Sequence, residues 1–365
     1  MIVPGECKMS REANQEAGLG MSWHRAMMVL GAAALLVALT QPAMAWDPKV
    51  NGYSQFRYEY SDSEGDGDFD TRRVRLSWKD TVNDEGTTFR IQLDFSDLLT
   101  GDGQSVSPKD IWVMQPWDNG WSTLVGYTTV MFGYELEYSS SKRLPFERST
   151  AARSFFPGER ALGAAVTYAV PDGAGVVFDL EYVDGMDAWD RDGVDDAESV
   201  IANVELPFGD GNVAGLSYMT SSIDLAPAAA QVAQDGSRGA SLSPDVWGLH
   251  IAMSHAIGTA GELALQAEYY DGDWYDHRAY EVYSADGWYA QLAFSPDGAE
   301  LTPFYRYDEF SYVPADGGSS DYSRHTLGVA YEPMENNRLT LQIEDIEDRG
   351  SDDTTVGLQW QVSYK

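Results

Sequence analysis

The sequence is poor in cysteine and in basic residues, and each shortage excludes a class of protein. Its 365 residues include one cysteine, Cys7, so neither a disulfide scaffold nor a cysteine-based zinc site can be built. Lysine and arginine number 24 against 58 acidic residues, which gives a formal net charge of −34. This acidity argues against nucleic acid as a partner, because phosphate neutralisation requires a basic surface. Beyond residue 45 no apolar run approaches the ~18–20 residues that a transmembrane helix requires.

The first 45 residues have the plan of an export signal. A basic head at His24 and Arg25 precedes an apolar run over residues 26–39, and residues 43–45 (Ala-Met-Ala) fit a small-residue cleavage site. The run is about 14 residues long, which is too short for a membrane anchor. We therefore predict an N-terminal extension and cleaved signal peptide over residues 1–45, whether the start is Met1 or Met21, and a mature domain over residues 46–365.

The mature domain alternates between apolar and polar residues with period two. The pattern is cleanest over residues 356–364 (VGLQWQVSY), where every second residue is valine, leucine, tryptophan or tyrosine. Residues 89–95, 176–182 and 263–269 follow the same pattern. Ten-residue segments of this kind are typical of outer-membrane barrels. A soluble β-sandwich alternates as well, but there the apolar face makes the core.

Connections of two lengths separate these segments, and this favours the barrel. Short links rich in Pro, Gly, Asp and Asn, such as residues 116–120 and 333–337, alternate with longer acidic links. Short periplasmic turns and long outside loops are what a bacterial barrel requires. The expected outside links are residues 61–70, 97–108, 129–159, 184–198, 221–245, 271–285 and 310–321. The predicted fold class is all-β, a 16-stranded antiparallel transmembrane β-barrel, of a size that leaves an aqueous channel.

Two stretches resemble the phosphate-selective porin O and P family. The first is residues 70–76 (DTRRVRL), and the second is residues 125–168, which contain Ser139-Ser140-Ser141, LPFERS at residues 144–149 and FPGER at residues 156–160. The resemblance implies a trimeric outer-membrane porin whose inward-folded third loop narrows the channel. The link count independently makes residues 129–159 the third outside loop.

Basic residues gather in this loop and on one wall of the predicted barrel. Residues 142–160 carry five basic side chains against Glu147 and Glu159. In the second strand Val74 and Leu76 face lipid, so the basic residues between them face the lumen, because a lipid-facing charge costs about 2–4 kcal/mol at the midplane. Arginine and lysine rings select anions in pores, and arginine offers phosphate a planar fork. The predicted anion-binding and constriction residues are Arg57, Arg73, Arg75, Lys79, Arg90, Lys142, Arg143, Arg148, Arg153 and Arg160.

We therefore expect passive diffusion of small anions, phosphate-like or pyrophosphate-like, through a bacterial outer-membrane porin that contacts lipid and lipopolysaccharide and uses no cofactor. Two alternatives stay open. The loop arginines could serve only to pair with acids such as Glu147, Glu159, Asp94 and Asp179. Acidic residues such as Glu59, Asp94 and Asp179 also have lumen parity, which would give a general or cation-preferring pore. A structural or adhesive barrel is the second alternative.

Signals for catalysis or metal binding are weak. The histidines His250, His255, His277 and His325 include no metal-spaced pair, and no G-x-S-x-G or Walker loop is present. The alternate carboxylates of residues 62–70 resemble a calcium loop, but position 12 of that loop would be Arg73 instead of glutamate. The sequence therefore predicts neither an enzyme nor a metal site.

Overall fold

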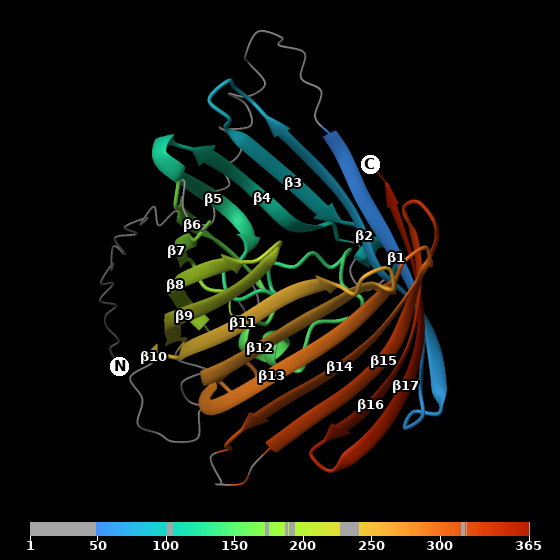
Figure 1. Ribbon diagram of the computed structural model, residues 1–365. Helices are drawn as coiled ribbons and strands as arrows, with labels where there is room; N and C mark the ends of the chain where they lie inside the picture. Colours follow the sequence, from blue (N-terminus) through green and yellow to red (C-terminus); the bar gives the residue numbers. More distant parts are fainter. Residues whose placement is uncertain are drawn as a thin grey trace, which may run out of the picture. The chain divides into compact units, whose positions relative to one another are not determined.

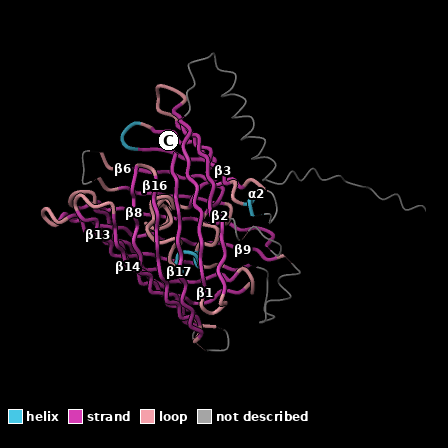
Figure 2. The backbone as a smooth tube through the Cα atoms, turned by 90° about the vertical axis from the view of Figure 1, so that its right-hand side faces the viewer, coloured by secondary structure: helices cyan, strands magenta, loops and turns pink. Residues whose placement is uncertain are grey.

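The computed structural model describes residues 49–100, 105–171, 175–186, 189, 194–226, 241–314, 318 and 320–364. The predicted signal segment, residues 1–45, lies outside the described residues. Strands dominate, with only short helices between them (Figures 1 and 2). Within the described ranges, no helix has the length and apolar character needed to cross a membrane.

The elements in chain order are β1 (Lys49–Ser61), β2 (Asp66–Thr81), β3 (Thr88–Asp94), α2 (Asp97–Thr100), β4 (Ser107–Pro116), η1 (Asp118–Gly120), β5 (Trp121–Thr129), α3 (Thr150–Phe155), β6 (Arg160–Ala169), β7 (Val177–Val183), β8 (Val194–Phe208), β9 (Asn212–Leu225), β10 (Ser241–Leu242), β11 (Asp245–Ala256), β12 (Gly261–Asp276), β13 (Glu281–Pro296), β14 (Leu301–Tyr312), β15 (Ser320–Met334), β16 (Asn337–Asp348) and β17 (Ser351–Tyr364).

The strands form one antiparallel sheet that closes on itself. The first strand pairs with the last, residues 52–61 of β1 lying opposite residues 355–364 of β17. The two-residue strand β10 pairs with β9 on the same side as β11, so it continues the line of β11. The described residues therefore form a closed 16-stranded antiparallel barrel, and the predicted fold class is confirmed.

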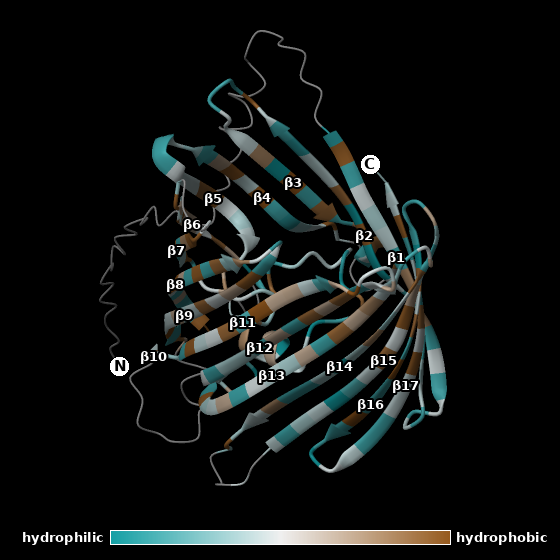
Figure 3. Ribbon diagram, in the orientation of Figure 1, coloured by the Kyte–Doolittle hydropathy of each residue, from teal (hydrophilic) through white to brown (hydrophobic). Residues whose placement is uncertain are grey.

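The period-two pattern of the sequence sets the two faces of the wall. Leu180, Leu327 and Trp360 point outward and are among the most exposed apolar side chains, while Arg75, Gln92 and Gln359 point inward and are buried. Brown and teal bands alternate along the strands in Figure 3 for this reason. An exposed apolar band of this extent is stable only in contact with lipid or another apolar surface.

Two hairpins are longer than the sequence predicted. Residues 61–70 and 271–285 were expected to be loops, but β1–β2 turns within residues 62–65 and β12–β13 turns within residues 277–280. The loop prediction was wrong there because aromatic side chains pair across both hairpins. Tyr58 lies opposite Phe69, and Trp274 lies opposite Tyr283 with ring centroids 5.8 Å apart. Such pairs stabilise a strand whose Asp and Gly content resembles a loop.

On one part of the barrel wall the inward-facing side chains are apolar instead of polar. Ile201, Met219, Ile223 and Val246 point inward from β8, β9 and β11 and are fully buried. Tyr270 of β12 is buried in the same cluster. These side chains pack against the chain between β5 and β6, which explains why apolar residues are tolerated inside the barrel.

Candidate functional site

The connection between β5 and β6, residues 130–159, is bonded to inward-facing side chains around the barrel; we call it the β5–β6 segment (green in Figure 1). The carboxylate of Glu268 on β12 accepts hydrogen bonds from the backbone N–H groups of Tyr134 (3.1 Å) and Glu135 (2.9 Å). Asp308 on β14 accepts from the N–H of Thr150 at 2.9 Å. Further bonds reach the segment from Tyr53, Gln55, Glu181, Ser217, Gln342 and Gln361. Because these partners lie on well-separated strands, the segment is fixed at many points.

Apolar packing adds to these anchors. Phe132 and Phe156 of the segment have ring centroids 4.5 Å apart, and each lies 6.1 Å from the ring of Tyr270. The short helix α3 is capped by Ser149, whose hydroxyl accepts from the N–H of Ala152 and donates to Glu135 at 2.6 Å. Phe155 of α3 packs edge-on against Phe310. The segment thus has a small core of its own against β12 and β14.

A cavity of about 510 Å³ lies between this segment and the wall formed by β2–β4. Eight basic residues line it against four acidic ones, so its lining is strongly positive within a chain of net charge −34. We call it the cationic cavity. Its charged lining residues are Arg72, Arg73, Arg75, Lys109, Arg143, Arg148, Arg153 and Arg278 with Asp94, Asp97, Glu147 and Glu159.

The carboxylates of the cavity engage part of this positive charge. Glu147 pairs with Arg57 (2.8 Å), Arg72 (2.6 Å) and Arg73 (3.1 Å). Glu159 pairs with Arg148 (2.9 Å) and Arg160 (2.7 Å). These arginines hold the pKa of Glu147 and of Glu159 well below the ordinary value, although burial acts in the opposite direction. Both groups are therefore ionised at neutral pH.

Arg143 and Arg153 of the segment have no such partner among the described residues. Arg143 is 5% exposed, and within the described part of the chain none of its three guanidinium nitrogens has a hydrogen-bond partner. Burial, together with Arg148 and Arg73 nearby, lowers the pKa of Arg143 well below its ordinary value. Arg153 is exposed, and no partner for its guanidinium is found among the described residues. A buried guanidinium with unmet donors is costly unless an acceptor reaches it.

The ten residues predicted from the sequence divide into two groups. Five of them line the cationic cavity: Arg73, Arg75, Arg143, Arg148 and Arg153. The other five lie outside its lining: Arg57, Lys79, Arg90, Lys142 and Arg160.

Arg57 and Arg160 of the second group contact the cavity through its carboxylates Glu147 and Glu159, whereas the other three residues form no ion pair with these carboxylates in the part of the chain that the structure describes. Arg90 pairs with Asp110 at 3.2 Å. Lys79 is exposed, with its ammonium 5.8 Å from the centre of the Trp112 ring, and Lys142 is exposed. Of the acids considered as arginine partners, Asp94 bonds Arg75 at 2.8 Å, whereas Asp179 accepts from Thr167 and Asn203.

Three basic cavity residues were missed by the sequence reasoning, and two of them lie at β-bulges. The pairing of β1 with β2 passes from Gln55↔Arg73 to Phe56↔Thr71, so Arg72 is the extra residue. The pairing of β3 with β4 skips Lys109 in the same way. A bulge reverses the local alternation, so Arg72 and Arg73 both reach Glu147. The third residue, Arg278, comes from the β12–β13 turn that the sequence placed in a long loop.

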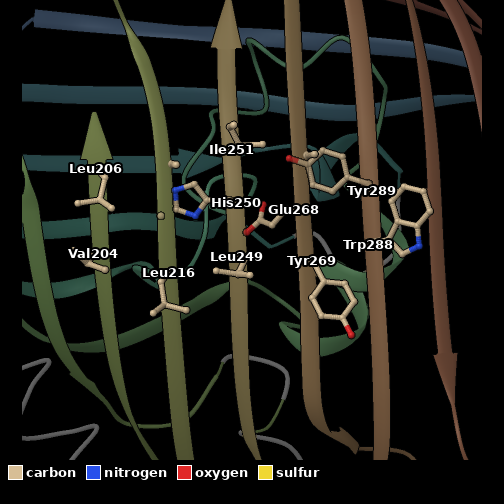
Figure 4. A pocket seen from close by; sticks show the side chains of 13 residues that line it. Val204, Leu206, Leu216, Leu249, His250, Ile251, Glu268, Tyr269, Trp288 and Tyr289 are labelled. Atoms are coloured by element: carbon tan, nitrogen blue, oxygen red, sulfur yellow. The ribbon is translucent and has the colours of Figure 1, made fainter. Parts of the chain in front are cut away.

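A second pocket, of about 640 Å³, lies across β8, β9, β11, β12 and β13 (Figure 4). Its lining is mainly apolar and includes the outward-facing Leu206, Leu216 and Leu249. His250 and Glu268 lie side by side on neighbouring strands behind these side chains. Its apolar, outward-facing lining makes it unsuitable as an ion path.

Comparison with solved structures identifies porins of the same fold. The loop L8 deletion mutant of OmpT, an outer membrane protein of Vibrio cholerae, is 13% identical with a TM-score of 0.60, covering 87% of this chain and 99% of that one. An anion-selective porin from Comamonas acidovorans gives the same identity, TM-score and coverage. The outer membrane channel DcaP of Acinetobacter baumannii is 15% identical with a TM-score of 0.60, covering 87% of this chain and 97% of that one. At these identities the likeness establishes the fold.

Sequence comparison goes further. No curated protein sequence gives a significant match to the chain. The family model for phosphate-selective porin O and P matches residues 49–365, which is the whole barrel. The chain therefore belongs to the phosphate-selective porin O and P family.

Proposed function

We propose that this porin lets small anions, phosphate-like in chemistry, diffuse passively across a bacterial outer membrane. In this proposal the β5–β6 segment narrows the lumen, and the anion passes through the cationic cavity. Family membership supports a porin, and the excess of basic over acidic residues in the cavity supports an anion. Since the segment is bonded to strands around the barrel, the narrowing would be permanent instead of a moving gate.

The observation that carries the proposal is the unpaired guanidinium of Arg143. It lines the cavity close to Arg73 and Arg148, and its donors are met by no group of the described chain. An entering oxyanion would supply the missing acceptors. The paired state of Arg73, Arg75 and Arg148 keeps the remaining interactions moderate, which suits a channel that must also release its ion.

We also propose a homotrimer and an exported precursor cleaved after residue 45. One solved structure of similar fold, in-vitro folded OmpT of Vibrio cholerae, is described as a trimer form. The exposed apolar band of the barrel supplies surface both for lipid and for neighbouring copies.

A cation-preferring pore is the second candidate, because the lumen also has an acidic side. Glu137 of the segment is close enough to Asp179, Glu181 and Glu205 for their charges to interact. None of the four carboxylates forms an ion pair with a lysine or arginine among the described residues. If ions pass mainly along this side, the pore would favour cations.

The test is the reversal potential of the purified porin in a KCl gradient across a planar bilayer, followed by addition of phosphate. An anion-selective sign with chloride current blocked by phosphate supports the first proposal. A cation-selective sign without a phosphate block supports the acidic path. Folded protein that inserts but conducts no ions would contradict both proposals and favour a structural barrel.

A further inference from the structure

Glu147 lies in a cradle of arginines that resembles an occupied anion site. Its Oε1 is 2.8 Å from Nη2 of Arg57 and 2.6 Å from Nε of Arg72, and its Oε2 is 3.1 Å from Nη2 of both Arg72 and Arg73. Arg72 thus binds the carboxylate with two parallel bonds, as arginine binds free carboxylates and phosphates. Three guanidinium groups around one carboxylate leave the cradle with excess positive charge.

The cradle can be reached from the cationic cavity. Arg72, Arg73 and Glu147 all line that cavity, and the side chains of Arg72 and Glu147 are 39% and 18% exposed. The unpaired Arg143 lines the same cavity. An anion in the cavity therefore lies beside the cradle arginines Arg72 and Arg73 and beside one guanidinium that has no hydrogen-bond partner in the described chain.

The backbone at Glu147 is held independently of its carboxylate. Arg306 donates to the carbonyl oxygen of Glu147 at 2.9 Å, and Gln342 accepts from the N–H of Phe146 at 3.1 Å. The ring of Phe146 lies 4.5 Å below the guanidinium of Arg57 and against Gly357, where a side chain would overlap it. The carboxylate could leave the arginines by rotation of its own side chain, and the segment would stay in place.

We propose that Glu147 is a built-in counter-anion, whose place among Arg57, Arg72 and Arg73 a permeating oxyanion takes. This inference rests on the proposed function and names the side chain that sets its selectivity. A tetrahedral oxyanion offers several acceptor oxygens and can replace the bonds that Glu147 gives up, whereas chloride is a single point acceptor and cannot. The exchange makes the pore discriminate against halide and weakens the binding of the oxyanion enough for release.

The experiment measures the sulfate concentration that halves the chloride current in planar bilayers, for the wild-type porin, E147Q and E159Q. Sulfate is the probe because its charge is constant near neutral pH. Glu147→Gln removes the competing charge and keeps the shape, and we expect half-block at about three- to tenfold lower sulfate. Glu159→Gln removes the same charge from the same cavity but leaves the cradle occupied; it frees Arg148 and Arg160 instead of the three cradle arginines, so its half-block concentration is expected to fall by less than that of E147Q.

Two outcomes would overturn the inference. Equal effects of E147Q and E159Q would mean that only the total charge of the cavity matters. A weaker block in E147Q would mean that Glu147 merely positions the arginines; E147D, which keeps the charge on a shorter arm, separates that case from misfolding, because it would then restore the block. A different result would contradict the proposed function itself, namely a cation-selective reversal potential in the wild-type porin.

Discussion

The carboxylate of Glu268 occupies the space that a side chain at position 133 would need. A Cβ built on Gly133 would overlap Oε1 of Glu268, and the backbone of Gly133 has a positive φ of 66°. The same carboxylate accepts the N–H groups of the next two residues. A glycine in the segment and a glutamate on the wall therefore together make the anchor that holds the entry of the β5–β6 segment.

Replacing Gly133 by alanine should loosen this anchor. The positive φ alone costs an L-residue about 1–2 kcal/mol, and the overlap with Glu268 adds to that cost. We expect G133A to show noisier single-channel current and faster trypsin cleavage at the arginines of the segment. Gly298 in the β13–β14 turn is the control, since its φ of 71° is similar and nothing lies within 4 Å of its Cβ position. Equal behaviour of G133A and G298A would show that the contact with Glu268 does not hold the segment.

Arg143→Gln should weaken anion binding more than the neighbouring Lys142→Gln. Both substitutions remove one positive charge from adjacent positions, but Arg143 is buried at the cavity and Lys142 is exposed outside its lining. We expect about tenfold more phosphate for half-block in R143Q, as the loss of charged hydrogen bonds implies, and less than a twofold change in K142Q. A similar change of the half-block concentration in both variants would mean that Arg143 acts only through its charge and not through hydrogen bonds to the anion.

Alternation of side chains predicted the wall of the barrel and could not predict the packing inside it. Arg73 and Arg75 were placed in the lumen correctly because Val74 and Leu76 next to them must face lipid. Periodicity carries no information about a bulge, so Arg72 was missed, as was Lys109.

Contacts between residues far apart in the sequence could not be predicted for a different reason. The bond between Glu268 and Glu135 joins residues 133 positions apart, and the ion pair between Arg306 and Glu135 joins residues 171 positions apart. The alternation of Arg306 with Tyr305 and Tyr307 could have placed that arginine in the lumen. Its partner could not be named, because a loop has no period that indicates which wall it contacts.

The bulge at Arg72 can be tested by cysteine labelling, because the chain's only cysteine is Cys7. Arg72→Cys should react with a charged, membrane-impermeant thiol reagent in proteoliposomes, since residue 72 lines the cavity. Val74→Cys, two positions along the same strand, should stay unmodified because it faces lipid. Strict alternation predicts the same orientation for both positions, so equal labelling of R72C and V74C would contradict the bulge.

The pH dependence of the block should follow the pKa of Glu147, which lies well below the ordinary 4.5. A carboxylate with a depressed pKa in the folded protein stays charged as the pH falls through 4.5, and it loses its ion pairs only when the pH reaches the folded value. The difference in sulfate block between wild-type porin and E147Q should therefore be constant from pH 7 to pH 4.5 and shrink at lower pH, as wild-type Glu147 takes up a proton. Planar-bilayer titrations of the two proteins in the same buffers measure this difference. If it disappeared between pH 7 and pH 5, the pKa of Glu147 would be raised instead of lowered, and the three arginines would not be holding its charge.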